Sequence, residues 1–403
     1  METKRYSVRK LSGTVNLWTD RSPLLPSLDL ELTERCNNDC MHCYINLPAD
    51  DAAARDRELS TDEWLRVLRE AAALGCLTVR LTGGEPLLRE DFEELYLAAR
   101  RLGLKVLLFT NATLIQPRLA RLLARVPPLE KVEVSLYGMH RESYEAVSRT
   151  PGSFEAAWRG VQLLRENRVP FVVKSALLPP NQGEMEVFEA WAEALPWTDH
   201  PPSYSMYFDL RGRRDSARKN RLIQRLRVTP EEGLAVEARR RETFWAEMQR
   251  FCSRFLSVPG ELLFTCGSGH GGGCVDAYGR LQLCMGLRHP ATVYDLQTGS
   301  LEDGVRNFFP RIRALKAENP DYLERCARCY LKSLCEQCPA NSWTEHGTLD
   351  TPVEYLCEIA HTHARYLGML GQDEMAWQVT NWKQRVKDLA GRNAPVETSA
   401  RRR

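Results

Sequence analysis

Three cysteines near the start of the chain have a spacing that could support chemistry. Cys36, Cys40 and Cys43 lie in the segment RCNNDCMHCYIN with the pattern C-x3-C-x2-C. Three thiolates can hold three irons of a [4Fe–4S] cube and leave the fourth iron open to another ligand. A structural zinc site needs a fourth protein ligand, and the position of His42 between two of the cysteines makes simultaneous chelation awkward. The spacing favours an iron–sulfur cluster, with a zinc site, a redox pair and coincidence as the alternatives.

The thirteen cysteines of the 403-residue chain fall into two regions. Four lie at or before residue 76 and nine lie between residues 252 and 357. The N-terminal segment METKRYSVRK lacks the apolar part of a signal peptide, and no apolar run approaches the roughly 20 residues that a membrane span needs. We therefore expect a cytoplasmic protein with no membrane partner. In a reducing cytosol, clustered thiols indicate metal ligands or catalytic groups rather than disulfides.

The charge balance gives no sign of a broad electrostatic partner. The 55 Lys and Arg residues nearly match the 53 Asp and Glu residues. Proteins that bind nucleic acid or anionic membranes through a charged face usually carry a clear excess of basic residues. We therefore expect no nucleic-acid partner.

Alternating strand and helix patterns surround the first cysteine region. Ser60 and Glu63 stand in capping-box register before an amphipathic stretch that ends at Gly75. The patterns predict strands at 28–32, 77–81, 105–109, 131–136, 170–177 and 204–210, and helices at about 60–75, 90–103, 117–125, 153–167 and 184–195. Six such repeats indicate an α/β fold with a parallel sheet, whether closed, partly closed or open. The cysteine loop then leaves the carboxyl end of the first strand, where ligands bind in such folds.

The cysteine loop resembles the defining loop of the radical S-adenosylmethionine (radical SAM) enzymes. In that family the amino and carboxylate groups of SAM chelate the open iron of the [4Fe–4S] cluster. The segment LTGGEPLLRED, with Gly83, Gly84 and Glu85, resembles the family's Gly-Gly-Glu-Pro element, whose backbone and glutamate hold the SAM amino group. The resemblance implies a parallel, partial TIM-type β/α barrel of about six repeats over residues 28–210.

Three further positions match the family's SAM contacts. The segment FTNATL, with Asn111, resembles the Thr-Asn-Gly element, although Ala112 stands in place of the glycine. Ser135 in VSLYG would face the ribose or methionine part of SAM, and Lys174 sits where a polar residue of the fifth strand often reaches the SAM carboxylate. For Ser135 and Lys174, a plain barrel-lining role is an equal alternative.

The second cysteine region resembles the SPASM domain, which carries two auxiliary iron–sulfur clusters in some radical SAM enzymes. Without that resemblance, CARCYLKSLCEQC could be two zinc knuckles, but the five residues between its cysteine pairs are few for that. The family pattern is matched except that the last gap is two residues instead of three, which puts ligation by Cys338 in doubt. The resemblance assigns one auxiliary cluster to Cys266, Cys284 and Cys338, and the other to Cys326, Cys329, Cys335 and Cys357.

The first of these auxiliary clusters is one ligand short. The candidates for the missing ligand are Cys274 and Cys252, and an open iron that binds substrate is the third option. Cys274 ranks slightly ahead because it lies within the predicted hairpin that leads to Gly279. Cys274 and Cys252 could equally be small buried residues with no ligand role. The isolated Cys76 is expected to be such a buried residue.

The composition predicts five parts along the chain. They are an N-terminal extension at 1–27, the radical SAM core at 28–210, a basic and helical linker at 211–260, the SPASM region at 261–370, and a C-terminal helix and tail at 371–403. The linker is expected to be solvated, with a surface for an acidic substrate as the alternative. The SPASM region is expected to be organised by metal rather than by an apolar core.

The resemblance also implies a reaction. A flavodoxin- or ferredoxin-type donor reduces the first cluster, and SAM is cleaved to methionine and a 5′-deoxyadenosyl radical that abstracts a hydrogen from the substrate. A peptide or protein substrate is favoured, and a small metabolite is the alternative. A third possibility is an electron-transfer protein without catalysis. No acid or base stands out by motif.

Overall fold

The computed structural model describes residues 25–198, 201–256, 258–335 and 338–391, and these form two compact units. The first unit contains the chain up to Arg227 and the segment Gly267–Arg313, and the second contains Val228–Cys266 and the chain from Ala314. Most of the predicted N-terminal extension and the end of the predicted tail lie outside the described residues.

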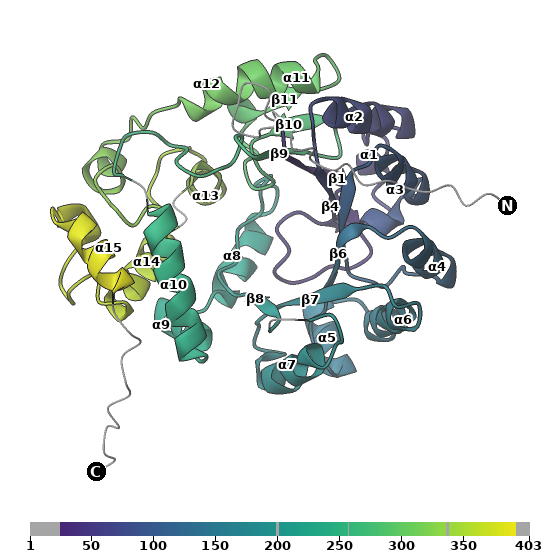
Figure 1. Ribbon diagram of the computed structural model, residues 1–403, viewed down its shortest axis with the longest axis horizontal. Helices are drawn as coiled ribbons and strands as arrows, with labels where there is room; N and C mark the ends of the chain where they lie inside the picture. The colour runs from purple at the N-terminus through teal and green to yellow at the C-terminus, as the bar shows by residue number, and fades with distance from the viewer. Residues whose placement is uncertain (1–24, 199–200, 257, 336–337, 392–403) are drawn as a thin grey trace, which may run out of the picture. The chain divides into compact units, whose positions relative to one another are not determined.

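One mixed sheet organises the first unit (Figure 1). Six parallel neighbours stand in the order β1-β4-β5-β6-β7-β8, and β9, β10 and β11 extend the sheet beyond β1. The strands are β1 Ser27–Thr33, β4 Thr78–Gly83, β5 Lys105–Thr110, β6 Leu129–Ser135, β7 Phe171–Ala176, β8 Ser203–Ser205, β9 Gly272–Val275, β10 Arg280–Gln282 and β11 Tyr294–Asp295. The predicted parallel, partial β/α barrel is confirmed.

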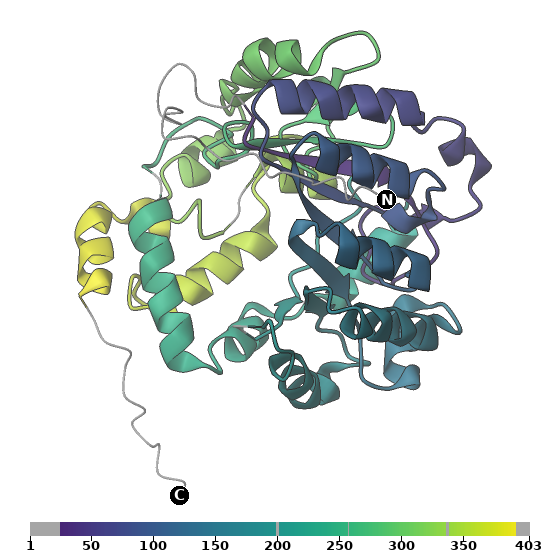
Figure 2. The same cartoon turned by 45° about the vertical axis from the view of Figure 1, so that its right-hand side comes forward.

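Helices cover the outer face of this sheet, as Figures 1 and 2 show for the purple-to-teal part of the chain. They are α2 Thr61–Ala73, α3 Phe92–Arg101, α4 Pro117–Arg125, α6 Ser153–Glu166 and α7 Met185–Glu193. Alternate apolar strand residues such as Leu28, Leu30 and Val106 are fully buried, and so is Trp64 of α2. Burying each large apolar side chain contributes about 1.5–3 kcal/mol, which is why the helices and strands follow the alternating pattern.

Two local features of the first unit differ from the sequence pattern. The predicted strand 204–210 is much shorter, because β8 ends at Ser205 and the chain beyond it turns inward, with Phe208 and Leu210 buried against Ile223. The helix α5, Arg141–Ser148, was not predicted. The small two-stranded sheet of β2 (Arg35–Cys36) and β3 (Leu47–Pro48) closes the base of the cysteine loop.

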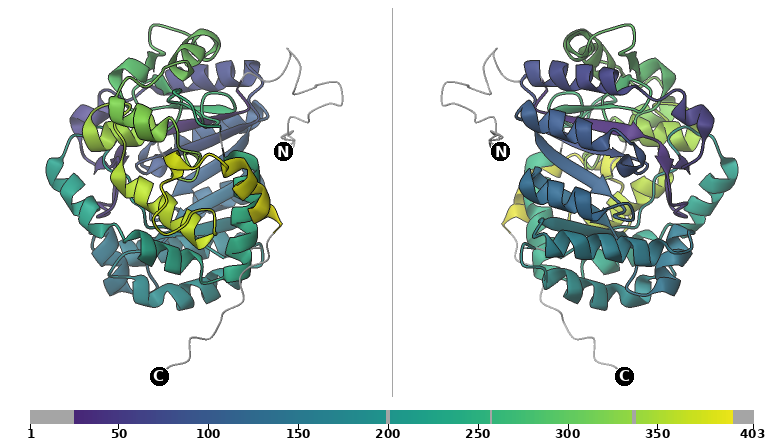
Figure 3. Two further views of the ribbon diagram at one scale, coloured as in Figure 1. Left: turned by 90° about the vertical axis from the view of Figure 1, so that its left-hand side faces the viewer. Right: turned by 90° about the vertical axis from the view of Figure 1, so that its right-hand side faces the viewer.

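The second unit is helical and has an apolar core. Its helices are α9 Pro230–Glu237, α10 Arg241–Phe255, α13 Pro339–His346, α14 Glu354–Tyr366 and α15 Trp382–Ala390, drawn in green and yellow in Figure 3. Buried side chains from α10, the segment 329–335, α14 and the following residues pack together. The expectation that this region lacks an apolar core is therefore wrong, because these segments supply enough apolar side chains for one, while the expected metal clusters stay a prediction.

None of the helices in the described part of the chain is both long and apolar enough to cross a membrane.

Candidate functional site

The first cysteine loop leaves β1 at the carboxyl end of the sheet and is tied down by main-chain hydrogen bonds. The Asp39 and Met41 amides donate to the Ser148 and Val147 carbonyls at the end of α5, both at 3.0 Å. The Cys43 amide donates to the Cys40 carbonyl at 3.1 Å, which folds the loop back on itself. The loop geometry therefore depends on α5, an element that the sequence pattern did not predict.

The three thiols of this loop act on one another. Burial, together with the neighbouring charge of Cys43, raises the pKa of Cys40 to about 12. Burial also raises the pKa of Cys36, with Cys40 and Cys43 among the contributors. Thiols that resist ionisation in this way are stabilised as thiolates when a metal neutralises them. The donor set on this loop suits a cluster that three cysteines share.

His42 packs against aromatic rings instead of acting as a ligand. Its ring is buried between the rings of Tyr137 and Phe208, at centroid distances of 5.2 Å from each. Burial, together with the Lys219 ammonium, lowers the pKa of His42 to about 4, so the imidazole is neutral near pH 7. The ring serves as packing under the loop.

Basic residues of the predicted linker hold the end of the cysteine loop. Arg211 is only 4% exposed, and its guanidinium donates to the Cys43 carbonyl at 3.3 Å and to the Asn46 carbonyl at 3.1 Å. The Lys219 ammonium donates to Asp39 at 2.9 Å and to Asn46 at 3.0 Å. These residues are not the solvated linker that the sequence suggested. Their only signal in the sequence was the excess of positive charge near 211–226, which says nothing about the contact made.

Gly83 and Gly84 lie against the chain itself. A Cβ on Gly83, whose φ is +133°, would lie 2.1 Å from the Thr33 carbonyl oxygen, and one on Gly84 would lie 2.2 Å from the Arg35 carbonyl oxygen. The Gly84 and Glu85 amides donate to these same carbonyls at 2.7 and 2.9 Å. The two glycines therefore bring the end of β4 into direct contact with the start of the cysteine loop.

Glu85 is fully buried and connects this element to the one after β5. Its carboxylate accepts hydrogen bonds from the Thr110 hydroxyl at 2.8 Å and the Asn111 amide at 2.7 Å. Burial raises the pKa of Glu85 to about 7, and these hydrogen bonds oppose that rise. The Asn111 side chain in turn donates to Asn37 at 3.0 Å and lies 3.8 Å from the Cys36 sulfur. Thr110 is the threonine of the Thr-Asn-Gly element matched in the sequence, whereas Asn37 also belongs to this network and was not singled out by any motif.

Ala112 has a φ of +62°, the left-handed conformation that favours glycine. The alanine therefore keeps the backbone path that a glycine would take here, at some conformational cost.

Ser135 and Lys174 are partners in register on β6 and β7. The Lys174 ammonium lies 2.6 Å from the Glu133 carboxylate and 5.1 Å from the centroid of the Phe109 ring, and its side chain is about half exposed. Lys174 thus stands on the wall of the partial barrel next to Ser135, with its charge paired by Glu133.

Cys274 and Cys284 belong to the first unit. Cys274 of β9 is fully buried and pairs in register with Asp29 of β1, and Cys284 follows β10 and is half-buried. The neighbouring Arg288 guanidinium donates to Glu31 at 2.5 Å and to Glu34 at 2.8 Å, which joins this segment to the end of β1. Burial raises the pKa of Glu31 to about 7 against the opposing effect of Arg288.

The remaining cysteines of the second region lie in the second unit. Cys266 is exposed, and Cys338 precedes the first turn of α13. Cys326, Cys329 and Cys357 lie close enough to interact electrostatically. Burial, with the charge of Cys357 adding to it, raises the pKa of Cys326 and of Cys329 to about 12.

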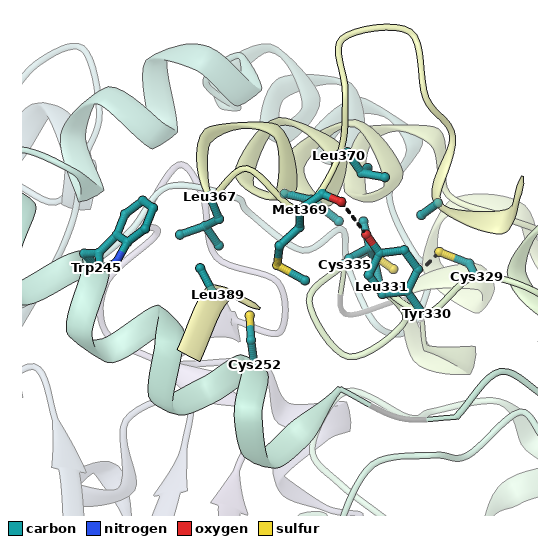
Figure 4. Close-up of a cluster of buried hydrophobic side chains, with 13 residues drawn as sticks. Trp245, Cys252, Cys329, Tyr330, Leu331, Cys335, Leu367, Met369, Leu370 and Leu389 are labelled. Atoms are coloured by element: carbon teal, nitrogen blue, oxygen red, sulfur yellow. Dashed lines mark hydrogen bonds between the residues drawn. The ribbon is translucent and has the colours of Figure 1, made fainter. Parts of the chain in front are cut away.

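Cys252 on α10 is buried in the apolar core of the second unit, together with Cys329 and Cys335 (Figure 4). Cys76 of the first unit is fully buried, as predicted.

Among the described residues, no three His, Cys, Asp or Glu side chains converge as the ligands of a single metal ion do. A cube places its cysteine ligands on different irons, so convergence on one point is not what a [4Fe–4S] site requires. The arrangement at Cys36, Cys40 and Cys43 can therefore hold such a cluster at the mouth of a parallel sheet, beside Gly83–Glu85 and Asn111.

Comparison with known proteins agrees with this geometry. Residues 30–191 match the family described as the radical SAM superfamily. The AdoMet-dependent heme synthase of Methanosarcina barkeri is 34% identical over 155 residues, which are 38% of this chain and 43% of that protein. The PqqA peptide cyclase of Rhodopseudomonas palustris is 35% identical over 148 residues, which are 37% of this chain and 38% of that protein. The chain thus spans less than half the length of these relatives.

Solved structures share the fold over most of the chain. Native anSMEcpe with bound AdoMet has a TM-score of 0.57 at 15% sequence identity, and the match covers 91% of this chain and 99% of the other. At this identity the likeness concerns the fold alone. The matched residues 30–191 include all three cysteines of the first loop and the Gly83–Glu85 element. The chain therefore contains a radical SAM domain.

Proposed function

We propose that this chain is a radical SAM enzyme that modifies a peptide or protein substrate. The observation that carries the proposal is the arrangement at the end of β1. There the loop with Cys36, Cys40 and Cys43 lies against Gly83 and Gly84, and Asn111 lies 3.8 Å from the Cys36 sulfur. The domain family implies a [4Fe–4S] cluster and SAM, which together supply a 5′-deoxyadenosyl radical after one-electron reduction.

The chain's own residues would bind and orient these groups. The three cysteines would hold the cluster, and the main chain at Gly83 and Gly84 would meet the SAM amino group beside it. Glu85 and Asn111 act as positioning residues in this proposal, because the Glu85 carboxylate is saturated by Thr110 and Asn111. Ser135 and Lys174 stand on the neighbouring wall, where a ribose hydroxyl or a carboxylate could pair with them.

The proposal extends to two auxiliary iron–sulfur clusters in a SPASM region. Cys326, Cys329, Cys335 and Cys357 would hold one, and Cys266, Cys284 and Cys338 would hold the other, with Cys274 or Cys252 as its fourth ligand. Cys274 keeps the slight preference that the hairpin pattern gives it, since both candidates are equally buried, Cys274 at 0% and Cys252 at 1% exposure. We retain 28–210 for the radical SAM barrel and 261–370 for the SPASM region, with 211–260 between them.

A peptide substrate is supported by two of the similar proteins. One relative is a PqqA peptide cyclase, and a structure of the same fold is native anSMEcpe with bound AdoMet and Cp18Cys peptide. A small metabolite is the second candidate, because another relative is a heme synthase. A flavodoxin- or ferredoxin-type protein would deliver the electron in either case.

Anaerobic reconstitution tests the enzyme. With iron, sulfide, dithionite, SAM and candidate substrate, we expect 5′-deoxyadenosine, and a protein with Cys36, Cys40 and Cys43 all changed to Ala should lose one cube of iron and all cleavage. Cys76→Ala is the control, since Cys76 is a fully buried thiol outside the cysteine motifs, with its sulfur at the Pro26 and Thr78 carbonyls. Intact first-cluster iron without any 5′-deoxyadenosine would contradict the enzyme proposal.

A second assay separates the two substrate classes. Peptides encoded beside the gene should change mass when incubated with the reconstituted enzyme and SAM. Turnover of a tetrapyrrole or nucleotide with no change in any such peptide would favour the small-metabolite alternative.

A further inference from the structure

Lys332 is a buried lysine in the spacer between Cys329 and Cys335. Lys332 is only 2% exposed, and its ammonium donates to the Gly260 and Leu262 carbonyls, both at 3.1 Å. These partners belong to the same unit. Within the described residues no carboxylate pairs with this ammonium. Among the described residues, the ammonium therefore faces only carbonyl oxygens and an aromatic ring. A buried positive charge in such surroundings is unfavourable unless a negative charge lies close to it.

The cysteines around Lys332 are the available source of that negative charge. Burial lowers the pKa of Lys332, and the thiols of Cys326, Cys335 and Cys329, in that order, oppose the shift. The backbone also links this lysine to two of them. The Leu331 amide donates to the Cys329 sulfur at 3.4 Å, and the Cys335 thiol donates to the Lys332 carbonyl at 3.4 Å. Thiolates that bind iron would provide the counter-charge that the lysine lacks.

Tyr322 packs beside Lys332. Its ring centroid lies 5.0 Å from the Lys332 ammonium, it is 1% exposed, and its hydroxyl has no hydrogen-bond partner among the described residues. Burial raises the pKa of Tyr322, and the charges of Cys326 and Cys335 add to the shift. Buried hydroxyls are nearly always paired, so an unpaired one beside thiols indicates a missing acceptor.

A neighbouring tyrosine shows the contrast. The Tyr330 hydroxyl, in the same unit, donates to the Met369 carbonyl at 3.0 Å (Figure 4). It is therefore satisfied by the protein, while the Tyr322 hydroxyl is not.

Arg325 is a second cation in this region, but its charge is already compensated. It lies 3.9 Å from the Cys357 sulfur and donates to both oxygens of Glu354, at 2.7 and 2.8 Å. Among the described residues, Lys332 is therefore the cation near these cysteines that lacks a carboxylate partner.

We propose that the Lys332 ammonium and the Tyr322 hydroxyl raise the reduction potential of the iron–sulfur cluster held by Cys326, Cys329, Cys335 and Cys357. The inference rests on the proposed function, which assigns a cluster to these cysteines. When the cluster accepts one electron, its net charge becomes more negative by one and no proton moves. A fixed positive charge and a hydrogen bond to sulfur stabilise that added charge, so the reduced state becomes easier to reach.

Redox titration of the reconstituted full-length chain, followed by electron paramagnetic resonance, tests the proposal. Cys329→Ala first identifies the couple that belongs to this cluster. Lys332→Gln removes the charge and keeps an N–H donor, and we expect it to lower the equilibrium constant for reduction of that couple about tenfold, or 59 mV for one electron. Tyr322→Phe should lower it by a smaller factor, and Lys332→Arg should leave it close to the parent value.

Two matched controls come from the same unit. Lys383→Gln changes an exposed lysine that also lies over an aromatic ring, at 5.6 Å from the Trp382 centroid. Tyr330→Phe removes a buried hydroxyl that the protein already satisfies. Neither should move the couple.

The outcomes separate this inference from the proposed function. If Cys329→Ala retains all the iron of the parent, the auxiliary cluster is wrong and the inference falls with it. If the cluster is present but Lys332→Gln and Tyr322→Phe titrate like the parent, only the inference is overturned. Loss of this cluster's iron in Lys332→Gln but not in Lys332→Arg would support the role of the charge, whereas loss in both would reduce Lys332 to a packing residue and overturn it.

Discussion

The two cysteine regions are held by different kinds of interaction. The loop of the first unit is fixed by hydrogen bonds to α5 and by the Arg211 and Lys219 side chains. The segment with Cys329 and Cys335 in the second unit is fixed largely by packing in an apolar core. The thiols themselves are buried to the same degree, since Cys40 and Cys329 are both 7% exposed. The difference therefore lies in what fixes each segment, which is directed hydrogen bonds in the first region and apolar packing in the second.

The strongest test of this difference compares one cysteine from each region. Cys40→Ala should reduce SAM cleavage to background, while its effect on folding stays small because the loop is held by main-chain bonds. Cys329→Ala should retain measurable cleavage of SAM and lower the free energy of unfolding of the apoprotein by about 1–2 kcal/mol, because it removes a sulfur from the core. Product analysis and denaturant unfolding measure the two effects. Equal losses of cleavage in both variants would contradict the division of roles.

A change at Arg211 removes side-chain hydrogen bonds that hold the first cysteine loop and leaves its thiols in place. Arg211→Met leaves the Asn46 and Cys43 carbonyls without their donor, which costs about 1–3 kcal/mol, whereas the partly exposed Asp215 keeps its hydrogen bond from Arg213. We expect less iron in the first cluster after reconstitution and unchanged iron in the second region. Iron analysis and urea unfolding measure these changes.

Arg221→Met is the control for that change, since Arg221 is an exposed arginine on the neighbouring helix α8, Ala217–Leu226. A first cluster that loads fully in Arg211→Met would show that the main-chain bonds suffice.

Substitution of Cys252 tests whether this cysteine is a core residue of the second unit or a cluster ligand. Its thiol is 1% exposed among apolar side chains, and Cys252→Ala should lower the free energy of unfolding by about 1 kcal/mol. The iron content should not change, whereas Cys274→Ala should lower it if Cys274 completes the other auxiliary cluster. Loss of iron in Cys252→Ala would reverse the preference between the two.

Local patterns in the sequence were enough to locate most elements of the barrel and the elements of the candidate site. The helix α2 begins at Thr61, directly after Ser60, the N-cap of the predicted capping box, and α4 has the bounds 117–125 that its periodicity indicated. The contacts of Arg211 could not be predicted, because they join residues about 165 positions apart and no spacing rule encodes them. The core of the second unit was missed for a similar reason, since short irregular segments such as 329–335 carry no period that reveals which side chains will be buried.

The smallest effects concern pH, and they have opposite signs in the two units. In the first unit, burial would raise the pKa of Asp215, but the hydrogen bonds and positive charges of Arg211 and Arg213 together outweigh it and the pKa falls to about 2. A carboxyl with a lowered pKa stabilises the fold above its unfolded pKa of about 4, and this contribution is lost as the pH falls toward 2. In the second unit, burial would lower the pKa of His363, but the Glu237 carboxylate, 2.6 Å away, outweighs it and raises the pKa. That contribution is complete below the unfolded pKa of about 6.5 and is lost as the pH rises through the folded value.

Unfolding of Asp215→Asn and His363→Gln across the pH range checks both signs. The stability difference between parent and Asp215→Asn should shrink in acid, and that between parent and His363→Gln should shrink as the pH rises above 7. Each effect should stay below about 1 kcal/mol, since Asp215 and Glu237 are both partly exposed and solvent screens their ion pairs. A His363→Gln difference that instead grows with pH would mean that the buried imidazole is neutral in the fold, and that the second unit gains nothing from its one histidine–carboxylate contact between α9 and α14.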